Sequence, residues 1–151
     1  MVKVNLQDLK KLRNETSASI ADCRLALEES DGDYKKALLF LKKRGIEKAE
    51  KKQDRTTSQG LIEYYIHQNG KVGSMIEILC ETDFVARTDE FKKLAHEVAM
   101  QVCAMNPKDI NALLKQEYIR DSSITMENLI KSVIGKLGEN IKIGKIVRFE
   151  I

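Results

Sequence analysis

The sequence is poor in the residues that carry most enzyme chemistry. Its 151 residues include no tryptophan, one proline, three cysteines and two histidines. No CxxC or HExxH pattern occurs, so a zinc site is weakly supported, and no glycine-rich phosphate loop is present. Serine, histidine and aspartate all occur, but nothing in their spacing groups them as a catalytic triad. We therefore expect neither an enzyme nor a protein with a bound metal or cofactor.

Long apolar runs are also absent. No stretch approaches the roughly 20 residues of a membrane span, and the N-terminus lacks the continuous apolar core of a signal peptide. The cysteines Cys23, Cys80 and Cys103 are odd in number and far apart, which fits free thiols in a reducing compartment. We expect a cytoplasmic protein without membrane contact. An organellar protein that has lost its targeting peptide would have the same features.

Neither sign of charge dominates the chain. There are 26 basic and 23 acidic residues, giving a net charge of +3, and apolar residues make up 42%. This composition is typical of a globular protein with one ordinary domain or two small ones. Dedicated nucleic-acid binders usually have a stronger basic bias, so a protein partner is at least as well supported.

The first 52 residues carry apolar side chains at helical spacing. Thr16 or Ser17 can cap the second of three helices, and Asp33 can cap the third. The pattern predicts a three-helix domain over 1–52, with helices at about 6–14, 20–27 and 34–45.

Residues 46–58 contain almost no large apolar side chains after Ile46 and mix basic with acidic residues. They are interpreted as a helical extension that fades into a linker, placed at 53–59. The basic stretch from Lys42 to Arg55 is also a candidate RNA contact through phosphates. Because acidic residues are interspersed and no aromatic platform accompanies it, a solvated helix end is favoured.

The hydrophobic period changes to two from Gly60 onward. The run Ile62, Tyr64 and Ile66 is typical of a half-buried strand. Asn69-Gly70 is a strong hairpin signal. The return strand places a second apolar set on one face: Ile76, Ile78 and Cys80.

The rest of the chain returns mainly to helical spacing. One helix is predicted from about Glu90 to Asn106, where Pro107 disfavours its continuation. Residues 108–124 are ambiguous apart from a short helix at 110–114. Thr125 can cap another helix, and the strand over 141–149 can join the hairpin. The prediction is an α+β chain: the helical domain, then a small antiparallel sheet packed with helices over 60–151.

A corner between a predicted strand and a predicted helix holds Thr82, Asp83, Phe84 and Val85. Position alone leaves two alternatives for Phe84: it folds back into the core, or it projects while its neighbours brace the corner. A rigid loop with one exposed aromatic is a common way to present an interface anchor. Cys80 and His96 form an imaginable thiol–imidazole pair, but a buried strand cysteine and a surface histidine are the simpler interpretation.

The corner also carries a family resemblance. Residues 80–87, Cys-Glu-Thr-Asp-Phe-Val-Ala-Arg, resemble the signature of elongation factor Ts, the nucleotide-exchange factor of elongation factor Tu. Other blocks of the sequence also resemble the family and occur in the same order as in its members. They are residues 12–16, 22–27, 94–100, 104–107, 136–141 and 148–150. The resemblance covers nearly the whole chain. It implies a ubiquitin-associated-like N-terminal domain and a role in translation elongation.

The resemblance also implies which residues contact the partner. In the family the pair here numbered Asp83 and Phe84 enters the GTPase domain, and the ring disturbs Mg²⁺ ligation so that GDP leaves. The other matching contact positions are Arg13, Ile20, Ala21, Leu137 and Gly138. The partner is thus expected to be elongation factor Tu, in its GDP and nucleotide-free forms, with no direct nucleic-acid contact.

The chain departs from the family pattern at its N-terminal contact. The family commonly has Thr-Gly-Ala-Gly followed by two methionines, whereas this chain has Thr16-Ser17-Ala18-Ser19-Ile20-Ala21. Less apolar surface is then available at this contact. Leu79 also replaces a usual asparagine.

The chain is also short for the family. It has no second core copy and no coiled-coil insertion, and short members associate in pairs, so a homodimer is expected. Two alternative functions are kept open: an RNA-binding translation accessory protein and a ubiquitin-like interaction module.

Overall fold

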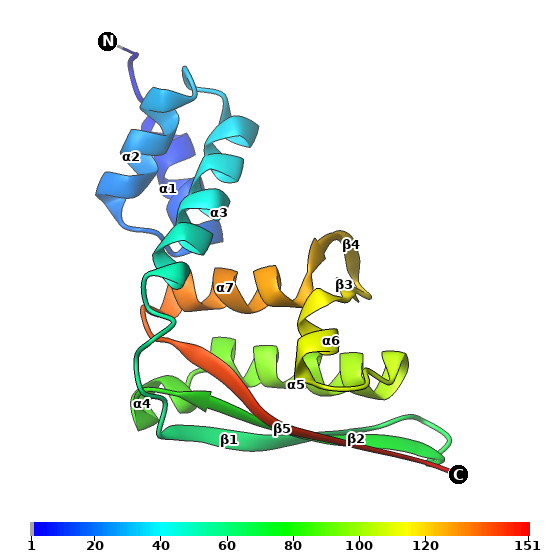
Figure 1. Ribbon diagram of the computed structural model, residues 1–151. Helices are drawn as coiled ribbons and strands as arrows, with labels where there is room; N and C mark the ends of the chain where they lie inside the picture. The colour runs from blue at the N-terminus through cyan, green and yellow to red at the C-terminus, as the bar shows by residue number, and fades with distance from the viewer. Residues whose placement is uncertain (1) are drawn as a thin grey trace.

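The computed structural model describes residues 2–151 and has an α+β architecture (Figure 1). Three helices form the N-terminal part: α1 (Leu6–Thr16), α2 (Ile20–Glu29) and α3 (Tyr34–Glu50). Their shared core is a small buried cluster made of Leu12, Cys23, Ala26, Leu27, Ala37 and Leu41. The predicted three-helix unit is therefore present. Its description as a domain that ends at residue 52 stays a prediction.

The caps of these helices match the expectation in one case and differ in another. Asp33 caps α3, since its side chain accepts a hydrogen bond from the Lys36 N–H. The prediction that Thr16 or Ser17 caps α2 is wrong, because Ser19 does so. Thr16 ends α1 and donates its hydroxyl proton to the Leu12 carbonyl at 2.7 Å, while Ser17 takes a left-handed conformation with φ of 56°.

The second part of the chain centres on a three-stranded antiparallel sheet. Its strands are β1 (Gln59–Ile66), β2 (Val72–Cys80) and β5 (Ile141–Glu150), with β2 in the middle. The Asn69-Gly70 turn joins β1 to β2, and Gly70 has the positive φ that such turns favour. The predictions that a hairpin forms here and that the last strand joins it are confirmed.

Helices cover one face of this sheet. They are α4 (Asp83–Ala86), α5 (Asp89–Met105), α6 (Ile110–Lys115) and α7 (Met126–Leu137). Figure 1 shows α5 lying along the sheet, with α7 above α5 and the three N-terminal helices above α7. Thr88 and Thr125 cap α5 and α7, and Asn106 ends α5 in a left-handed conformation. None of the helices in residues 2–151 is long and apolar enough to cross a membrane.

The ambiguous region before α7 contains a second, small sheet. After the predicted short helix α6, a two-stranded ribbon forms from β3 (Glu117–Tyr118) and β4 (Asp121–Thr125). Two buried side chains of α5 hold this ribbon. Glu97 accepts hydrogen bonds from Tyr118 and Arg120, and Gln101 contacts backbone groups of Glu117 and Ile119.

One expectation about the sheet is wrong. The alternation in β1 suggested that Ile62, Tyr64 and Ile66 face the core, but all three side chains are exposed. The core is packed instead by Leu61 and Tyr65 of the opposite face. Both faces of β1 carry large apolar residues, so the alternation alone could not decide which face α5 covers. In β2 the prediction is confirmed, since Ile76, Ile78 and Cys80 are all buried.

The linker region is more closely attached to the core than its composition indicated. Helix α3 continues beyond Gly45, and Ala49 near its end is buried in the main core with residues of the sheet and of α7. Asn140 is buried and its amide donates to the carbonyls of Gln53 and Arg55, at 3.2 and 2.9 Å. The first residues after α3 are thereby tied to the start of β5.

Candidate functional site

Phe84 lies on the single turn of α4, between the end of β2 and the start of α5. Its side chain is 85% exposed. Val85 and Ala86 of the same turn are buried, as is Cys80 at the end of β2. Of the two alternatives that the sequence left open, the structure therefore has the projecting one, with an exposed ring on a turn anchored from both sides.

Local hydrogen bonds brace this corner. The Thr82 hydroxyl accepts from the Val85 N–H at 3.4 Å and so caps α4. Thr88 caps α5 by accepting from the Phe91 N–H at 3.2 Å, and it donates to the Val85 carbonyl at 2.8 Å. The Asp83 carboxylate pairs with the Arg87 guanidinium at 2.5 Å, one helical turn further along.

Val85 differs from the other residues of the predicted site because its side chain belongs to the main core. While the corner keeps this conformation, a partner can reach Thr82, Asp83 and Phe84 but not the Val85 side chain. Burying a valine stabilises a fold by roughly 1.5–3 kcal/mol. Val85 thus anchors the turn from inside and leaves Phe84 to point outward.

Two further predicted residues, Leu137 and Gly138, end α7 close to this corner. Leu137 packs on the main core, and Gly138 is exposed with a φ of 77° that suits glycine. The next residue, Glu139, accepts two hydrogen bonds from Thr82. The corner and the end of α7 therefore form one surface (Figure 1, lower left). Sequence reasoning missed Glu139, because contacts between residues this far apart leave no periodic signal.

The remaining predicted residues lie on the three-helix unit. Arg13 is exposed on α1, and Ile20 and Ala21 are exposed at the start of α2, where Ile20 keeps 52% of its surface in solvent. The short turn between α1 and α2 separates Arg13, near the end of α1, from Ile20 and Ala21 at the start of α2. In Figure 1 the unit stands above the end of α7 that neighbours α4.

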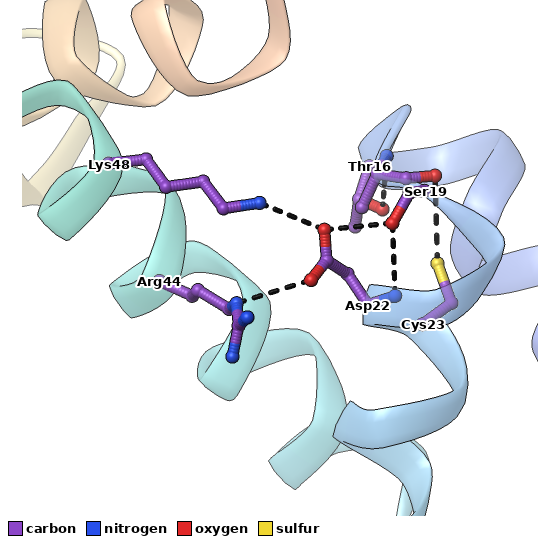
Figure 2. Close-up of polar contacts among 7 residues, drawn as sticks. Thr16, Ser19, Asp22, Cys23, Arg44 and Lys48 are labelled. Carbon is purple, nitrogen blue, oxygen red and sulfur yellow. Dashed lines mark hydrogen bonds and ion pairs between the residues drawn. The ribbon is translucent and has the colours of Figure 1, made fainter. Parts of the chain in front are cut away.

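Asp22 holds the start of α2 against α3. Figure 2 shows its carboxylate between the two helices, with Lys48 and Arg44 reaching toward it from α3. Lys48 Nζ lies 2.9 Å and Arg44 Nε 3.2 Å from the carboxylate oxygens, and the Ser19 hydroxyl donates to it at 2.9 Å. The hydrogen bond from Lys48 lowers the pKa of Asp22 below its ordinary value, although partial burial opposes this shift. The network orients Ile20 and Ala21, its direct neighbours in the chain.

Several members of the basic stretch at residues 42–55 are engaged within the protein. Arg44 and Lys48 pair with Asp22, and Arg55 lies 3.7 Å from the Glu81 carboxylate. The two pairs with Asp22 join α2 to α3, and the third pair joins the segment after α3 to the end of β2. They leave Lys42, Lys43, Lys51 and Lys52 as the main exposed or partly exposed cations of the stretch.

The residues considered for catalysis have other contacts. Cys80 is buried and its thiol donates to the Thr82 carbonyl at 3.2 Å, and burial raises its pKa. The His96 ring packs edge-on against Tyr65 with centroids 5.7 Å apart. Cys23, Cys80 and Cys103 are all free and buried. Within residues 2–151, no three His, Cys, Asp or Glu side chains gather as metal ligands would.

Comparison with known proteins decides the family. The family model described as "Elongation factor TS" matches residues 81–151, from the signature corner to the last strand. Elongation factor Ts of Fervidobacterium nodosum is 35% identical, with 99% of each chain covered. The chain belongs to the elongation factor Ts family. The elongation factor Ts proteins of Coprothermobacter proteolyticus and Thermotoga maritima are each 38% identical, and 99% and 97% of their lengths are covered.

Membership of the elongation factor Ts family makes the chain a translation elongation factor. The alignment with the Fervidobacterium protein spans 195 positions, whereas this chain has 151 residues. The relative therefore contains residues that have no counterpart here, although the alignment covers both chains almost completely.

Proposed function

We propose that this chain is a guanine-nucleotide exchange factor that binds elongation factor Tu in its GDP form and promotes GDP release. The observation that carries this proposal is the exposure of Phe84 on a turn whose next two residues, Val85 and Ala86, are buried. A large exposed apolar ring is costly in water and gains free energy when a partner buries it. Because the turn is already built, little conformational entropy is lost on binding.

The mechanism follows from thermodynamic linkage. A factor that binds nucleotide-free elongation factor Tu more tightly than the GDP form must weaken GDP binding by the same ratio. Mg²⁺ bridges nucleotide phosphates and protein ligands in GTPases. A ring that wedges between side chains near this site displaces the ligands and lowers GDP affinity without breaking a covalent bond. Phe84 acts as the wedge, and Thr82, Asp83 and Val85 support it. No residue of this chain needs to act as an acid, base or nucleophile.

The other proposed contacts lie at the end of α7, beside the wedge, and on the three-helix unit beyond it (Figure 1). Leu137 and Gly138 extend the surface of the corner, and Arg13, Ile20 and Ala21 form a separate contact on the three-helix unit. The second contact holds the partner while the ring enters. Ile20 and Ala21 offer less apolar area than two methionines, so we expect Phe84 and Asp83 to carry a larger share of the binding in this chain.

We propose that the outer face of the sheet joins two copies of the chain. This face exposes apolar side chains from all three strands: Ile62, Tyr64, Ile66, Met75, Val147 and Phe149. The strand register places Tyr64, Met75 and Val147 side by side in its centre. Monomeric soluble proteins rarely expose large contiguous apolar patches, and such patches commonly serve as interaction surfaces. A two-fold pairing buries the same patch on both copies.

The experiment that tests the exchange function is the release of a fluorescent GDP from elongation factor Tu, in the cytoplasmic ionic conditions where we expect the protein to act. Addition of this chain should accelerate release in a concentration-dependent and saturable way. If the release rate is the same with and without the chain, the proposal is wrong. The alternative of an RNA-binding accessory protein would then be tested by salt-dependent RNA affinity.

A further inference from the structure

Glu139 links the end of α7 to the corner that carries Phe84. Its carboxylate accepts the Thr82 backbone N–H at 2.9 Å on one oxygen and the Thr82 hydroxyl at 2.7 Å on the other. The two residues are 57 positions apart in the chain. A carboxylate that accepts two hydrogen bonds from one residue defines both its position and its orientation.

The orientation of Thr82 matters because its hydroxyl has two roles. It donates its proton to Glu139, which leaves a lone pair free to accept the Val85 N–H at 3.4 Å and cap α4. Helix α4 has four residues, too few to be stable by themselves. Phe84 adds no stabilisation from packing, since its ring is in solvent. The direction of the ring therefore depends on the supports of the turn. Val85 and Ala86 hold it through the core and Thr88 through a hydrogen bond, and Glu139 adds a polar support from a segment distant in the chain.

Glu139 is itself held in place by its neighbours. The left-handed conformation of Gly138 turns the chain sharply at the end of α7. On the other side, buried Asn140 donates its backbone N–H to Glu81 at 3.3 Å and its amide protons to the carbonyls of Gln53 and Arg55. These contacts leave the Glu139 backbone little freedom, so its carboxylate is a firm attachment for Thr82.

We propose that Glu139 is a positioning residue for the exchange reaction: it holds Thr82 so that Phe84 projects in one direction. The inference rests on the proposed function and names a residue that acts on Phe84 indirectly, through Thr82. Its carboxylate is occupied by Thr82. Loss of the carboxylate leaves the outer contacts at Arg13, Ile20 and Leu137 in place, so a complex still forms. Fewer complexes then have the ring in the wedging position.

The test measures GDP release from elongation factor Tu over a range of concentrations of the full chain. Glu139→Ala should lower the maximal release rate about tenfold, the effect of losing charge-assisted hydrogen bonds, and should change the half-saturating concentration much less. Thr82→Val, which removes only the hydroxyl contacts, should also lower the maximal rate. Thr82→Ser keeps the hydroxyl and should recover most of the rate that Thr82→Val loses. The double variant with Phe84→Ala should be no slower than Phe84→Ala alone.

A second measurement separates positioning from a loss of fold. In Glu139→Ala, amide hydrogen exchange should accelerate at Val85–Thr88, while the amides of Ile76 and Ile78 in β2 stay protected. If the β2 amides also lose protection in Glu139→Ala, that variant has lost its fold and its release rate says nothing about positioning. The release rate of Thr82→Val then decides whether Glu139 positions the corner, because Thr82 is exposed and its substitution removes no buried group.

Three outcomes would overturn the inference, and a fourth concerns the proposed function itself. An unchanged maximal rate in Thr82→Val and Glu139→Ala, with a loss in Phe84→Ala, leaves the exchange function intact and removes the role of Glu139. A further loss from Glu139→Ala in the Phe84→Ala background means that Glu139 acts elsewhere. A rise in half-saturating concentration at constant maximal rate makes it a binding residue. If Phe84→Ala itself has no effect, the wedge proposal is wrong.

Discussion

Gly135 of α7 packs directly on the backbone of Gly45 of α3. A Cβ atom added to Gly135 would lie 2.9 Å from both the Cα and the carbonyl oxygen of Gly45. The two helices can approach this closely only because Gly135 has no side chain at the contact. Lys131 of α7 also pairs with Glu50 of α3 at 3.3 Å. The three-helix unit is therefore joined to the core by helix packing, and the N-terminal contact residues stand at a set distance from Phe84.

This crossing predicts opposite effects for two alanine substitutions. Gly135→Ala should lower the free energy of unfolding by about 1–2 kcal/mol, because the new methyl group meets backbone that cannot move aside easily. Gly45→Ala is the matched control, since a Cβ at Gly45 meets nothing within 4 Å. It should be neutral or stabilise by up to about 1 kcal/mol through helix propensity. Urea unfolding of both variants measures the difference, and equal effects would contradict the close approach.

Phe84→Ala should fold normally and lose most of its stimulation of GDP release. The ring is exposed, so its removal should change stability by no more than about 0.5 kcal/mol. Loss of an interface anchor of this kind should lower the rate of GDP release at least about tenfold. Leu39→Ala is the control, because Leu39 is a similarly exposed residue of α3 outside the proposed contacts. A clear drop in the melting temperature of Phe84→Ala would point to a structural role for the ring.

The N-terminal contact is tested by restoring the apolar surface that the family pattern has there. Ile20→Met together with Ala21→Met should tighten binding to elongation factor Tu severalfold, because more apolar area becomes available for burial. Point substitutions suit this test better than removal of residues 1–55, since α3 packs on α7 and Ala49 lies in the main core. Titration calorimetry gives the affinity. No change in affinity would exclude Ile20 and Ala21 from the contact.

Met75→Glu should separate two copies of the chain if the outer sheet face joins them. Met75 lies between Tyr64 and Val147 in the centre of this face and keeps 50% of its surface exposed. A carboxylate buried there without a partner strongly disfavours association. Leu39→Glu places the same charge on exposed apolar surface of α3 and should leave pairing unchanged. Sedimentation equilibrium distinguishes the states. A wild-type chain that stays monomeric at high concentration would exclude this dimer.

Two serines, Ser17 and Ser19, replace glycines of the family pattern. We expect Ser17 to lower the stability of the fold and Ser19 to raise it. Ser17 has a φ of 56°, a left-handed conformation that disfavours residues with a side chain. Ser17→Gly should therefore raise the free energy of unfolding by about 0.5–1 kcal/mol. Ser19 caps α2 and contacts Asp22, so Ser19→Ala should cost about 1 kcal/mol. Thermal unfolding of both variants gives the signs, and a destabilising Ser17→Gly would contradict the conformational argument.

Local chemistry in the sequence determined most of the elements of this fold. Asp33, Thr88 and Thr125 sit where helices begin because their side-chain oxygens bind free N–H groups of the first turn. Asn69-Gly70 specified the hairpin because its glycine accepts a positive φ. The corner at Phe84 was visible from the change of period on either side of it. These signals involve residues within a few positions of one another.

Only the tertiary structure decided which surfaces meet. Whether Phe84 projected and which face of β1 was covered depended on neighbours distant in the chain. The hold of Glu139 on Thr82 and the contact of Gly135 with Gly45 join segments 57 and 90 positions apart. Such contacts arise from packing between elements, and no periodicity or propensity along the chain encodes them. For this protein the sequence determined the parts and the family, and packing determined how the proposed wedge is aimed.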